Sequence, residues 1–319
     1  MAPVYPLSGI AAVRDALFIM ATDTPHSAEY FGEQRDFWWN HDFLQLMARR
    51  WKLPQAPRLL DVGCGIGHWG RLMLSLVSDR ATLVGVDREP KWVAEATQRA
   101  AKRGLSARTE YRLGDATALP FDDASFDVVT CQTLLIHLKD PEAALAGMKR
   151  VLKPGGSLIV AEPQNLSSAL LLGKSRFHAP VAELVTQAQF LIRCERGKEA
   201  LGEGNNSIGE LVPGMFARLG LQDLSVYQSD MASPLLAPYA TPAQRAQKEQ
   251  LLEWADRDFW GWDREDARRF FIAGSGPEAQ FEADWAVLRE AAQQVAAAVR
   301  AGTEEIVGTG VFFLIAGRK

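Results

Sequence analysis

The sequence has few of the features that mark a secreted, membrane-spanning or nucleic-acid-binding protein. Its 319 residues include three cysteines, at the distant positions 64, 131 and 194, and an odd number at such spacing argues against a disulfide framework. There is no run of about eighteen apolar residues, so no transmembrane span is predicted. The partly apolar stretch 10–20 is interrupted by Arg14 and Asp15 and lacks the basic start of a signal peptide. We therefore expect a cytoplasmic protein.

The sequence also has no excess of basic residues and no cysteine or histidine spacing typical of a metal site. The formal net charge is -4, whereas a nucleic-acid-binding face needs clustered basic residues, so no nucleic-acid partner is expected. No Cys-x-x-Cys pair or matching histidine spacing occurs, and we therefore predict no metal site. The three cysteines fit either a role in metalloid chemistry or burial as small apolar residues, and their spacing favours burial.

The most informative segment is Leu59 to Arg71, which reads LLDVGCGIGHWGR. A short apolar run predicts a buried strand, the glycines at 63, 65 and 67 predict a tight turn, and His68 to Leu76 has helical spacing. A strand, a glycine turn and a helix N-terminus together predict a nucleotide-type site at the carboxyl edge of a sheet.

Two kinds of ligand fit this segment. Gly65, Gly67 and Gly70 satisfy the dinucleotide pattern G-x-G-x-x-G, and Asp87 follows about twenty residues later, as that pattern expects. Asp61, however, directly precedes the glycines, where its carboxylate would repel a pyrophosphate and attract an amino group.

The full string D-x-G-C-G-x-G resembles the first motif of the class I S-adenosylmethionine (SAM) methyltransferases. Further segments resemble that family in the same order: Thr82 to Val86 with Asp87, the Gly114-Asp115-Ala116 turn, Phe121 to Val129, and VLKPGGSLIV from Val151 to Val160. The resemblance implies an α/β fold, a seven-stranded Rossmann-like sheet with helices on both faces. It covers roughly residues 58 to 162.

The resemblance implies cofactor-binding roles for residues at the ends of the first four strands. Asp61 and the glycine loop would hold the methionine part of SAM, Asp87 the ribose, and Asp115 with Ala116 the adenine. The full predicted set is Asp61, Gly63, Cys64, Gly65, Gly67, Asp87, Arg88, Asp115, Ala116 and Gln132.

Residues 132 to 137 follow the fourth strand and would face the methyl group in this fold. The sequence there departs from the Asn-Pro-Pro-Tyr of amide and nucleobase methyltransferases. His137 is a candidate general base, because its ordinary pKa suits chemistry near pH 7, or a histidine that holds a carbonyl at a helix start. Glu162, at the end of the fifth strand, is a candidate base or cation ligand at the pocket mouth, or a solvated strand end.

Segments outside the motif region are predicted to form a helical cap. Residues 1–57 form an N-terminal helical cap or lid, in which Tyr30, Trp38, Trp39 and His41 are candidate acceptor contacts; packing on the core is the alternative. Residues 58–163 form the SAM-binding core and 164–220 a helical cap segment. Residues 221–231 and 304–319 supply the last two strands, the latter from Ile306 to Ala316, and 232–303 form a helical insertion. The tryptophan-rich stretch 254–263 is expected to pack within the cap, with a cation cage or a dimer contact as alternatives.

The sequence therefore predicts a SAM-dependent methyltransferase that acts by direct in-line displacement on an O or N atom of a small molecule, such as a secondary metabolite or a quinone-like compound. The expected partners are the small-molecule acceptor and, as one option, a second copy of the chain in a homodimer. The alternatives are a small-molecule C-methyltransferase, an NAD(P)-dependent oxidoreductase that uses Gly65, Gly67 and Gly70, and a regulatory protein that binds SAM without transferring its methyl group.

Overall fold

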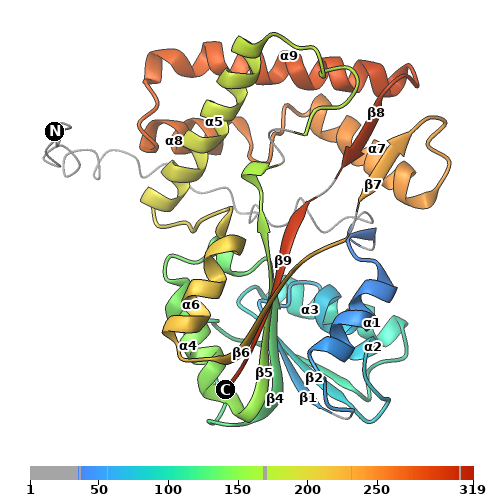
Figure 1. Cartoon of the computed structure of the whole chain (residues 1–319), viewed down its shortest axis with the longest axis vertical. Helices are drawn as coiled ribbons and strands as arrows, with labels where there is room; N and C mark the ends of the chain where they lie inside the picture. The colour runs from blue at the N-terminus through green and yellow to red at the C-terminus, as the bar shows by residue number, and fades with distance from the viewer. Residues whose placement is uncertain (1–34, 36, 56, 168–170, 231, 309) are drawn as a thin grey trace, which may run out of the picture. The chain divides into compact units, whose positions relative to one another are not determined.

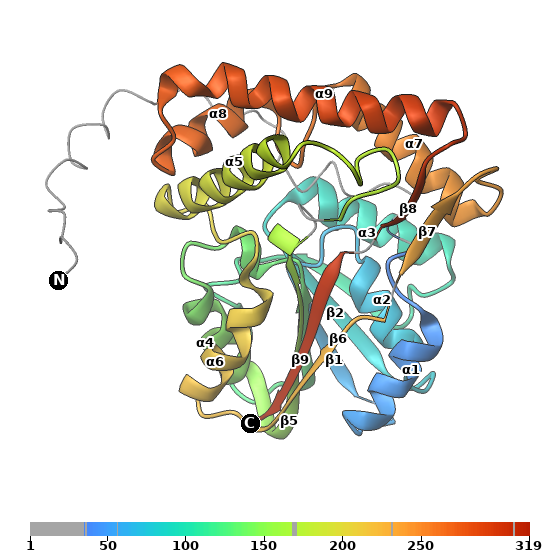
Figure 2. The same ribbon diagram turned by 45° about the horizontal axis from the view of Figure 1, so that its top comes forward.

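The computed structural model describes residues 35, 37–55, 57–167, 171–230, 232–308 and 310–319. All of them lie in one compact unit, Glu33–Lys319. The unit contains a large central sheet, helices on its faces, and a second group of helices beyond one edge of the sheet (Figures 1 and 2).

The central sheet has seven strands in the order β3-β2-β1-β4-β5-β9-β6. They are β1 (Arg58–Val62), β2 (Thr82–Asp87), β3 (Thr109–Leu113), β4 (Phe126–Gln132), β5 (Leu152–Gln164), β6 (Gln222–Gln228) and β9 (Val311–Arg318). The pairs among β1 to β5 are parallel, and β9 is antiparallel to both of its neighbours. This architecture confirms the predicted seven-stranded α/β fold.

Helices cover the two faces of the sheet in separate apolar clusters. On one face, α1 (His41–Arg50) and α2 (His68–Ser75) contribute Leu44, Met47, Trp69 and Met73 to one cluster. On the other, α4 (Pro141–Val151) and α6 (Val212–Arg218) contribute residues such as Met148 and Phe216 to a second. Helix α3 (Pro90–Lys102) follows β2. Helix α2 lies where the sequence predicts it. Asp140 caps α4 by accepting a hydrogen bond from Ala143 N at 2.9 Å.

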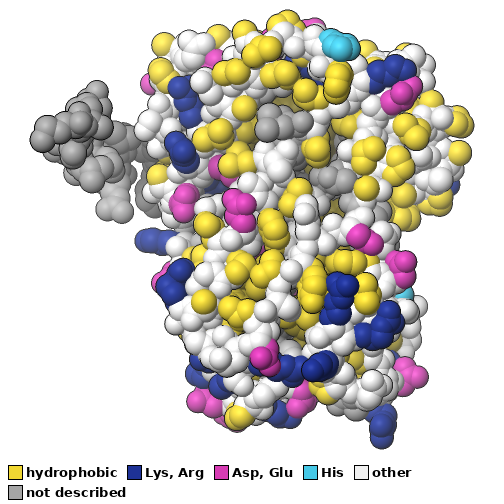
Figure 3. All heavy atoms as spheres, viewed as in Figure 1, with side chains coloured by type: hydrophobic (Ala, Val, Ile, Leu, Met, Phe, Trp, Pro, Cys, Tyr) yellow, Lys and Arg dark blue, Asp and Glu magenta, His cyan; other side chains and the backbone are white. Residues whose placement is uncertain are grey.

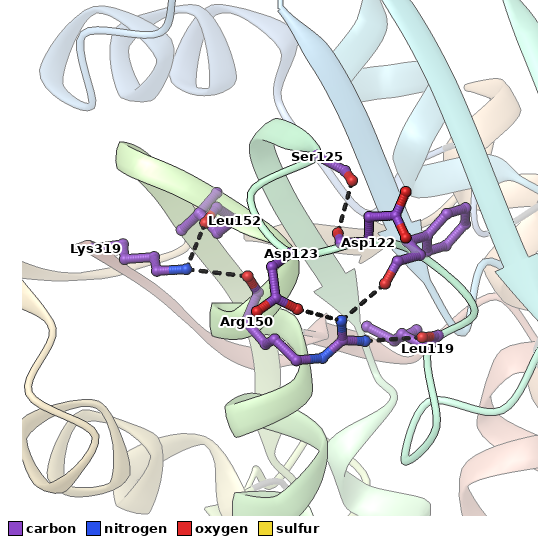
Figure 4. A network of polar contacts seen from close by, with 8 residues as sticks. Leu119, Asp122, Asp123, Ser125, Arg150, Leu152 and Lys319 are labelled. Carbon is purple, nitrogen blue, oxygen red and sulfur yellow. Dashed lines mark hydrogen bonds and ion pairs between the residues drawn. The ribbon is translucent and has the colours of Figure 1, made fainter.

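A polar network holds the edge of the sheet at which β4 and β5 begin (Figure 4). Arg150 at the end of α4 donates hydrogen bonds to the carbonyls of Leu119 and Phe121 and to the carboxylate of Asp123. The Lys319 ammonium donates to the carbonyls of Arg150, at 3.0 Å, and Leu152, at 2.7 Å. These hydrogen bonds connect the loops at this edge of the sheet. The glycine loop lies at the opposite edge, where the parallel strands end.

The second group of elements, here called the cap, lies beyond the carboxyl ends of the parallel strands (Figures 1 and 2). It consists of α5 (Val181–Ala200), α7 (Pro242–Asp256), α8 (Arg264–Ala273), α9 (Phe281–Arg300), and the two-stranded sheet of β7 (Ser233–Leu236) and β8 (Glu305–Gly308). Its core is aromatic: the ring of Phe190 in α5 stacks on Phe271 in α8, with centroids 5.1 Å apart. The tryptophan-rich stretch packs here, since Trp262 is buried against Phe270.

The structure differs from the predicted segment boundaries in three places. The run 306–316 is divided between β8 in the cap and β9 in the core, because its first residues pair with β7 rather than with β5. The segment 164–220 is also divided, since α5 lies in the cap whereas η6 (Ile208–Leu211) and α6 pack on the sheet. Within 1–57, the described helix α1 packs on the sheet because Leu44 and Met47 are buried there; residues 1–34 and 36 lie outside the described residues.

Candidate functional site

The glycine turn predicted from the sequence joins β1 to α2. Gly63, Gly65 and Gly67 have φ angles of +66°, +49° and +72°, a left-handed backbone that glycine adopts without a steric penalty. Cys64 N donates to the carbonyl of Val86 at 2.9 Å, which ties the turn to the neighbouring strand β2. The turn therefore lies at the carboxyl edge of β1 and β2 with its backbone tightly folded.

Asp61 is a buried carboxylate beneath this turn. Its side chain is 1% exposed, and Oδ2 accepts a hydrogen bond from Gly70 N at 2.9 Å. Its other oxygen, Oδ1, is buried without a hydrogen-bond partner among the described residues. Burial raises the pKa of Asp61 to about 7, against the hydrogen bond from Gly70 and the charge of Arg35. A buried acceptor oxygen of this kind requires a donor, and a cationic one suits it best.

Gly70 serves the packing of α2 on the sheet. A Cβ at this position would lie 2.8 Å from Asp61 Oδ2 and 2.9 Å from Leu83 Cδ2. The third glycine of the G-x-G-x-x-G match is therefore explained by the close approach of helix and strand, without a pyrophosphate.

Asp87, at the end of β2, shapes the glycine turn from the side. Its Oδ2 accepts from Gly65 N at 2.8 Å and its Oδ1 from Glu89 N at 3.0 Å. Each carboxylate oxygen has a second lone-pair direction, so Asp87 can accept further hydrogen bonds from a ligand. Arg88 points away: its side chain is 72% exposed and pairs with Glu89 at 3.5 Å.

The turn after β3 lies next to Asp87, because Gly114 N donates to the Asp87 carbonyl at 3.0 Å. Asp115 is exposed there, and its Oδ1 accepts from the hydroxyl of Thr117 at 2.7 Å and from its backbone N–H at 2.8 Å. These hydrogen bonds lower the pKa of Asp115. Ala116 follows and is half-buried. Three of the predicted ligand-binding turns thus meet at one edge of the sheet.

Beyond β4, residues 133–138, here called the β4 loop, lie against the glycine turn. A Cβ on Gly63 would be 2.6 Å from Leu134 Cδ1, so the Leu134 side chain covers that glycine. Gln132, the last residue of β4, is 3% exposed, and neither its amide oxygen nor its nitrogen has a hydrogen-bond partner among the described residues. Gln132 therefore presents a second unsatisfied polar group beside Asp61's turn.

The structure places the two catalytic candidates differently. His137 ends the short 3-10 helix η4 (Leu135–His137) and is half-buried. Glu162 is fully buried, and its Oε1 accepts from Leu134 N and Leu135 N, each at 2.9 Å. Burial raises the pKa of Glu162 to about 7. Glu162 is thus neither a solvated strand end nor a group at a pocket mouth; it holds the backbone of the β4 loop, and its catalytic role remains a prediction.

The acceptor contacts predicted near the N-terminus are not brought together at the glycine turn. Trp39 is buried in the apolar cluster of the sheet, its ring 5.1 Å from that of Trp69. Trp38 is half-buried against Phe312, at 5.6 Å. His41 is exposed at the start of α1 and hydrogen-bonds to Gln45, while Tyr30 lies outside the described residues.

Three residues of the site were missed by the sequence analysis. Arg35 is 8% exposed, and burial lowers its pKa to about 10 against the opposing charge of Asp61. At Gly67, a Cβ would lie 2.6 Å from the Tyr111 hydroxyl and 2.7 Å from Arg71 Nη1. Arg71 directly follows Gly70, and this position was the one signal visible in the sequence. Its burial, at 8% exposure, is a finding of the structure.

The cap contains a cavity of about 240 Å³. Its walls come from α5, α9, β8 and the segment 171–176, and they are mostly aliphatic, with Trp260 as the aromatic residue. Leu171 follows the end of β5 and Ile306 precedes the start of β9, and those two strand ends pair through Gln164 and Val311. The cavity therefore lies within the cap and is lined in part by the segment 171–176, which follows β5 in the chain.

The described part of the chain has neither a metal-binding cluster nor a membrane-spanning helix. No group of three or more His, Cys, Asp or Glu side chains there could hold a metal ion. None of the described helices is long and apolar enough to cross a membrane. All three cysteines are buried with free thiols.

Residues 60–160 match the protein family described as "Methyltransferase domain". A demethylmenaquinone methyltransferase of Thermus thermophilus is 42% identical over 111 residues, which are 34% of this chain and 49% of that protein. A ubiquinone/menaquinone biosynthesis C-methyltransferase of Teredinibacter turnerae is 34% identical over 137 residues, 41% of this chain and 55% of that protein. The chain thus spans about half the length of these two relatives.

Among solved structures, the YcgJ protein of Bacillus subtilis superposes with a TM-score of 0.47 and 20% sequence identity. The superposition covers 88% of this chain and 99% of that one.

Proposed function

We propose that this chain, whose residues 60–160 form a class I methyltransferase domain, transfers the methyl group of S-adenosylmethionine to a small-molecule acceptor. The observation that carries the proposal is the buried Asp61 carboxylate beneath a left-handed glycine turn. One of its oxygens has no hydrogen-bond partner among the described residues. Such a group suits the ammonium of an amino acid and repels a pyrophosphate.

The residues around Asp61 fit the rest of the cofactor. The glycine turn would hold the methionine part, with Arg35 as the nearby cation for its carboxylate. Asp87 would accept the ribose hydroxyls through its remaining lone pairs, and the Gly114–Asp115 turn beside it would meet the adenine. The unsatisfied amide of Gln132 adds a donor and an acceptor at the end of β4.

The chemical demands on the protein are modest. The bound cofactor supplies an activated methyl group on a sulfonium centre. The chain must therefore align an acceptor atom behind that methyl and exclude water. The β4 loop, packed on the glycine turn, is the element in place to do so, and His137 at its end would take the proton where the acceptor atom carries one.

The acceptor is proposed to be a small molecule with an apolar portion. The cap cavity supports this, since a lining that is mostly aliphatic favours apolar groups. The names of the two relatives above support a quinone-like compound. On the face seen in Figure 3, Lys and Arg are interspersed with Asp and Glu, which gives no support to a nucleic-acid acceptor there.

Transfer to an O or N atom is the leading proposal, and transfer to carbon is the second. The C-methyltransferase name of the Teredinibacter relative favours the second. Incubation with methyl-labelled SAM and a panel of phenols, amines and quinone precursors, followed by mass spectrometry of the product, distinguishes the two.

The test of the proposed function is calorimetric titration with S-adenosylhomocysteine and, separately, with NAD⁺. We expect binding of the first only, and Asp87→Asn should weaken it at least tenfold. The reason is that each charge-assisted hydrogen bond to a ribose hydroxyl contributes about 1.5–3 kcal/mol. Asp79→Asn is the matched control, since Asp79 is exposed and pairs with Arg108 away from the turn. Binding of NAD⁺ instead, or equal affinity in both variants, would contradict the assignment.

A further inference from the structure

The β4 loop is held from two sides by buried charged side chains that none of the sequence motifs includes. On the core side, Glu162 of β5 accepts hydrogen bonds from two consecutive backbone amides of the loop, Leu134 N and Leu135 N. Because the Leu134 side chain covers Gly63, these hydrogen bonds fix the part of the loop that lies on the glycine turn.

On the cap side, the loop is held by Lys198 near the end of α5. The side chain is 4% exposed, and its Nζ donates to the Ile136 carbonyl at 2.7 Å and to Asn206 Oδ1 at 3.2 Å. Gly204 reaches the same carbonyl: its φ is +93°, and a Cβ there would collide with the Ile136 oxygen. Lys198 and Gly204 thus both approach the β4 loop at the peptide group that joins Ile136 to His137.

Burying the ammonium of Lys198 costs free energy. Burial lowers its pKa to about 8, although the charges of Glu195, Glu203, Glu162 and Asp266 all favour the ammonium form. Replacing a buried ion pair by well-packed apolar residues is often neutral or stabilising in proteins. A buried lysine whose ammonium ends on a loop carbonyl is therefore better explained by the geometry that it imposes than by the stability that it adds.

We propose that Lys198 is a positioning residue for methyl transfer, which couples the cap to the cofactor turn through the Ile136 carbonyl. With that carbonyl held by α5 and the preceding amides held by Glu162, Leu134 and His137 keep one arrangement at the glycine turn. The assignment of a methyl-transfer role to the loop rests on the proposed function. The clamp itself is a statement about this chain's own backbone, and it can be tested without an acceptor.

The test compares Lys198→Met with Arg196→Met, which removes a positive charge from an exposed position on the same helix. Amide hydrogen exchange is followed for residues 133–138, and S-adenosylhomocysteine affinity is measured by calorimetry. For Lys198→Met we expect exchange at Leu134 and Leu135 to accelerate by roughly tenfold or more, while β1 and β4 stay protected. The affinity should fall several-fold, because Leu134 no longer holds the turn. Arg196→Met should leave both unchanged.

Two further variants separate positioning from general support. Lys198→Arg keeps a cationic donor, so exchange in residues 133–138 should be much closer to the wild-type rate than in Lys198→Met. Lys198→Gln replaces the ammonium by a shorter, neutral amide and is the second variant should the methionine protein not fold. It should loosen the loop in the same place, because the amide does not supply the charge or the reach of the lysine.

Each outcome bears on one proposal or the other. Uniformly faster exchange across the whole unit in the lysine variants would show a merely structural role and overturn the clamp. Exchange and affinity indistinguishable from those of Arg196→Met would also overturn it. If the wild-type protein binds no S-adenosylhomocysteine, yet Lys198→Met shows the localised acceleration of exchange, the clamp is supported and the proposed function is refuted.

Discussion

Gly67 and Gly104 have nearly the same backbone conformation in different surroundings. Comparing them separates two requirements for glycine, a left-handed backbone and space for the neighbouring side chains. Their φ angles are +72° and +70°. A Cβ on Gly67 would lie 2.6 Å from the Tyr111 hydroxyl, whereas one on Gly104 would meet no atom within 4 Å. Both positions need glycine for the left-handed backbone, and Gly67 alone needs it for space.

We therefore predict that Gly67→Ala weakens S-adenosylhomocysteine binding by about tenfold or more, whereas Gly104→Ala leaves the affinity unchanged. Both substitutions should lower the melting temperature through the left-handed strain of about 1 kcal/mol. Calorimetry and thermal melts of the two proteins check this. Equal affinities in the two variants would mean that Gly67 does not border the ligand.

The residues that sequence could identify are those whose partners are close in the chain. Asp61, the glycines and Asp87 belong to one strand–turn–helix–strand unit, so their spacing alone places them together. Lys198 was missed because it acts on a group that is distant in sequence, the Ile136 carbonyl. Arg35 was missed because it precedes the strand–turn–helix–strand unit that contains Asp61, so no motif spacing includes it. Glu162 was predicted at the correct strand end. Its burial could not be predicted, because it depends on the β4 loop folding back over it.

Helices α5 and α8 pack with their backbones in direct contact. A Cβ on Gly197 of α5 would collide with the Phe270 carbonyl, and one on Gly274 after α8 with the Arg193 carbonyl. Gly147 in α4 is also helical, but the nearest atom to a Cβ there is the Ala116 oxygen at 3.8 Å. Two helical glycines in the same protein thus have opposite requirements.

From this contrast we predict that Gly197→Ala destabilises the cap and Gly147→Ala stabilises the protein. The first must separate two helices, at a cost of about 1–3 kcal/mol or more, and the second gains about 0.5–1 kcal/mol of helix propensity. Thermal unfolding gives the signs, and hydrogen exchange should show faster exchange in α5 and α8 for Gly197→Ala. A gain in stability from Gly197→Ala would contradict the observed packing.

At this scale, the strands of the core were predictable because apolar runs and turn residues bound them closely. The division of 305–318 was not: its residues continue one apolar pattern, and only the pairing of Ile306 with Leu235 draws the first part into the cap. The position of α6 was missed, and that of α1 was left open between the cap and the core, for a related reason: an amphipathic helix can bury its apolar face on a sheet or on other helices.

Three buried carboxyl groups make the stability of the whole unit depend on pH. Burial raises the pKa values of Asp61, Glu162 and Glu195 each to about 7. The folded state therefore retains protons that the unfolded chain has released, and stability falls as pH rises from the ordinary carboxyl range through pH 7. Arg35, Lys198 and the backbone amides around these groups oppose the effect without removing it.

We predict that the melting temperature of the ligand-free protein decreases between pH 5 and pH 8, and that S-adenosylhomocysteine flattens this decrease. The ligand's ammonium favours the ionised form of Asp61, so its affinity should rise with pH through 7. Asp61→Asn should remove that part of the pH dependence from both measurements. A melting temperature that rises steadily over this range, or a pH-independent affinity, would contradict the ionisation assigned to Asp61.

The division of the cap between two separate stretches of chain limits how the protein can be re-engineered. One stretch supplies α5 and the other supplies α7, α8, α9 and both cap strands, yet α5 and α8 fit each other backbone to backbone. A graft that exchanges only residues 232–303 for the cap of another enzyme would leave Phe190 and Cys194 of α5 without their partners. If the cap selects the acceptor, as proposed above, both inserts must be exchanged together. The insert that contains α5 also contains Lys198, so each exchange would replace the hydrogen bond to the Ile136 carbonyl as well.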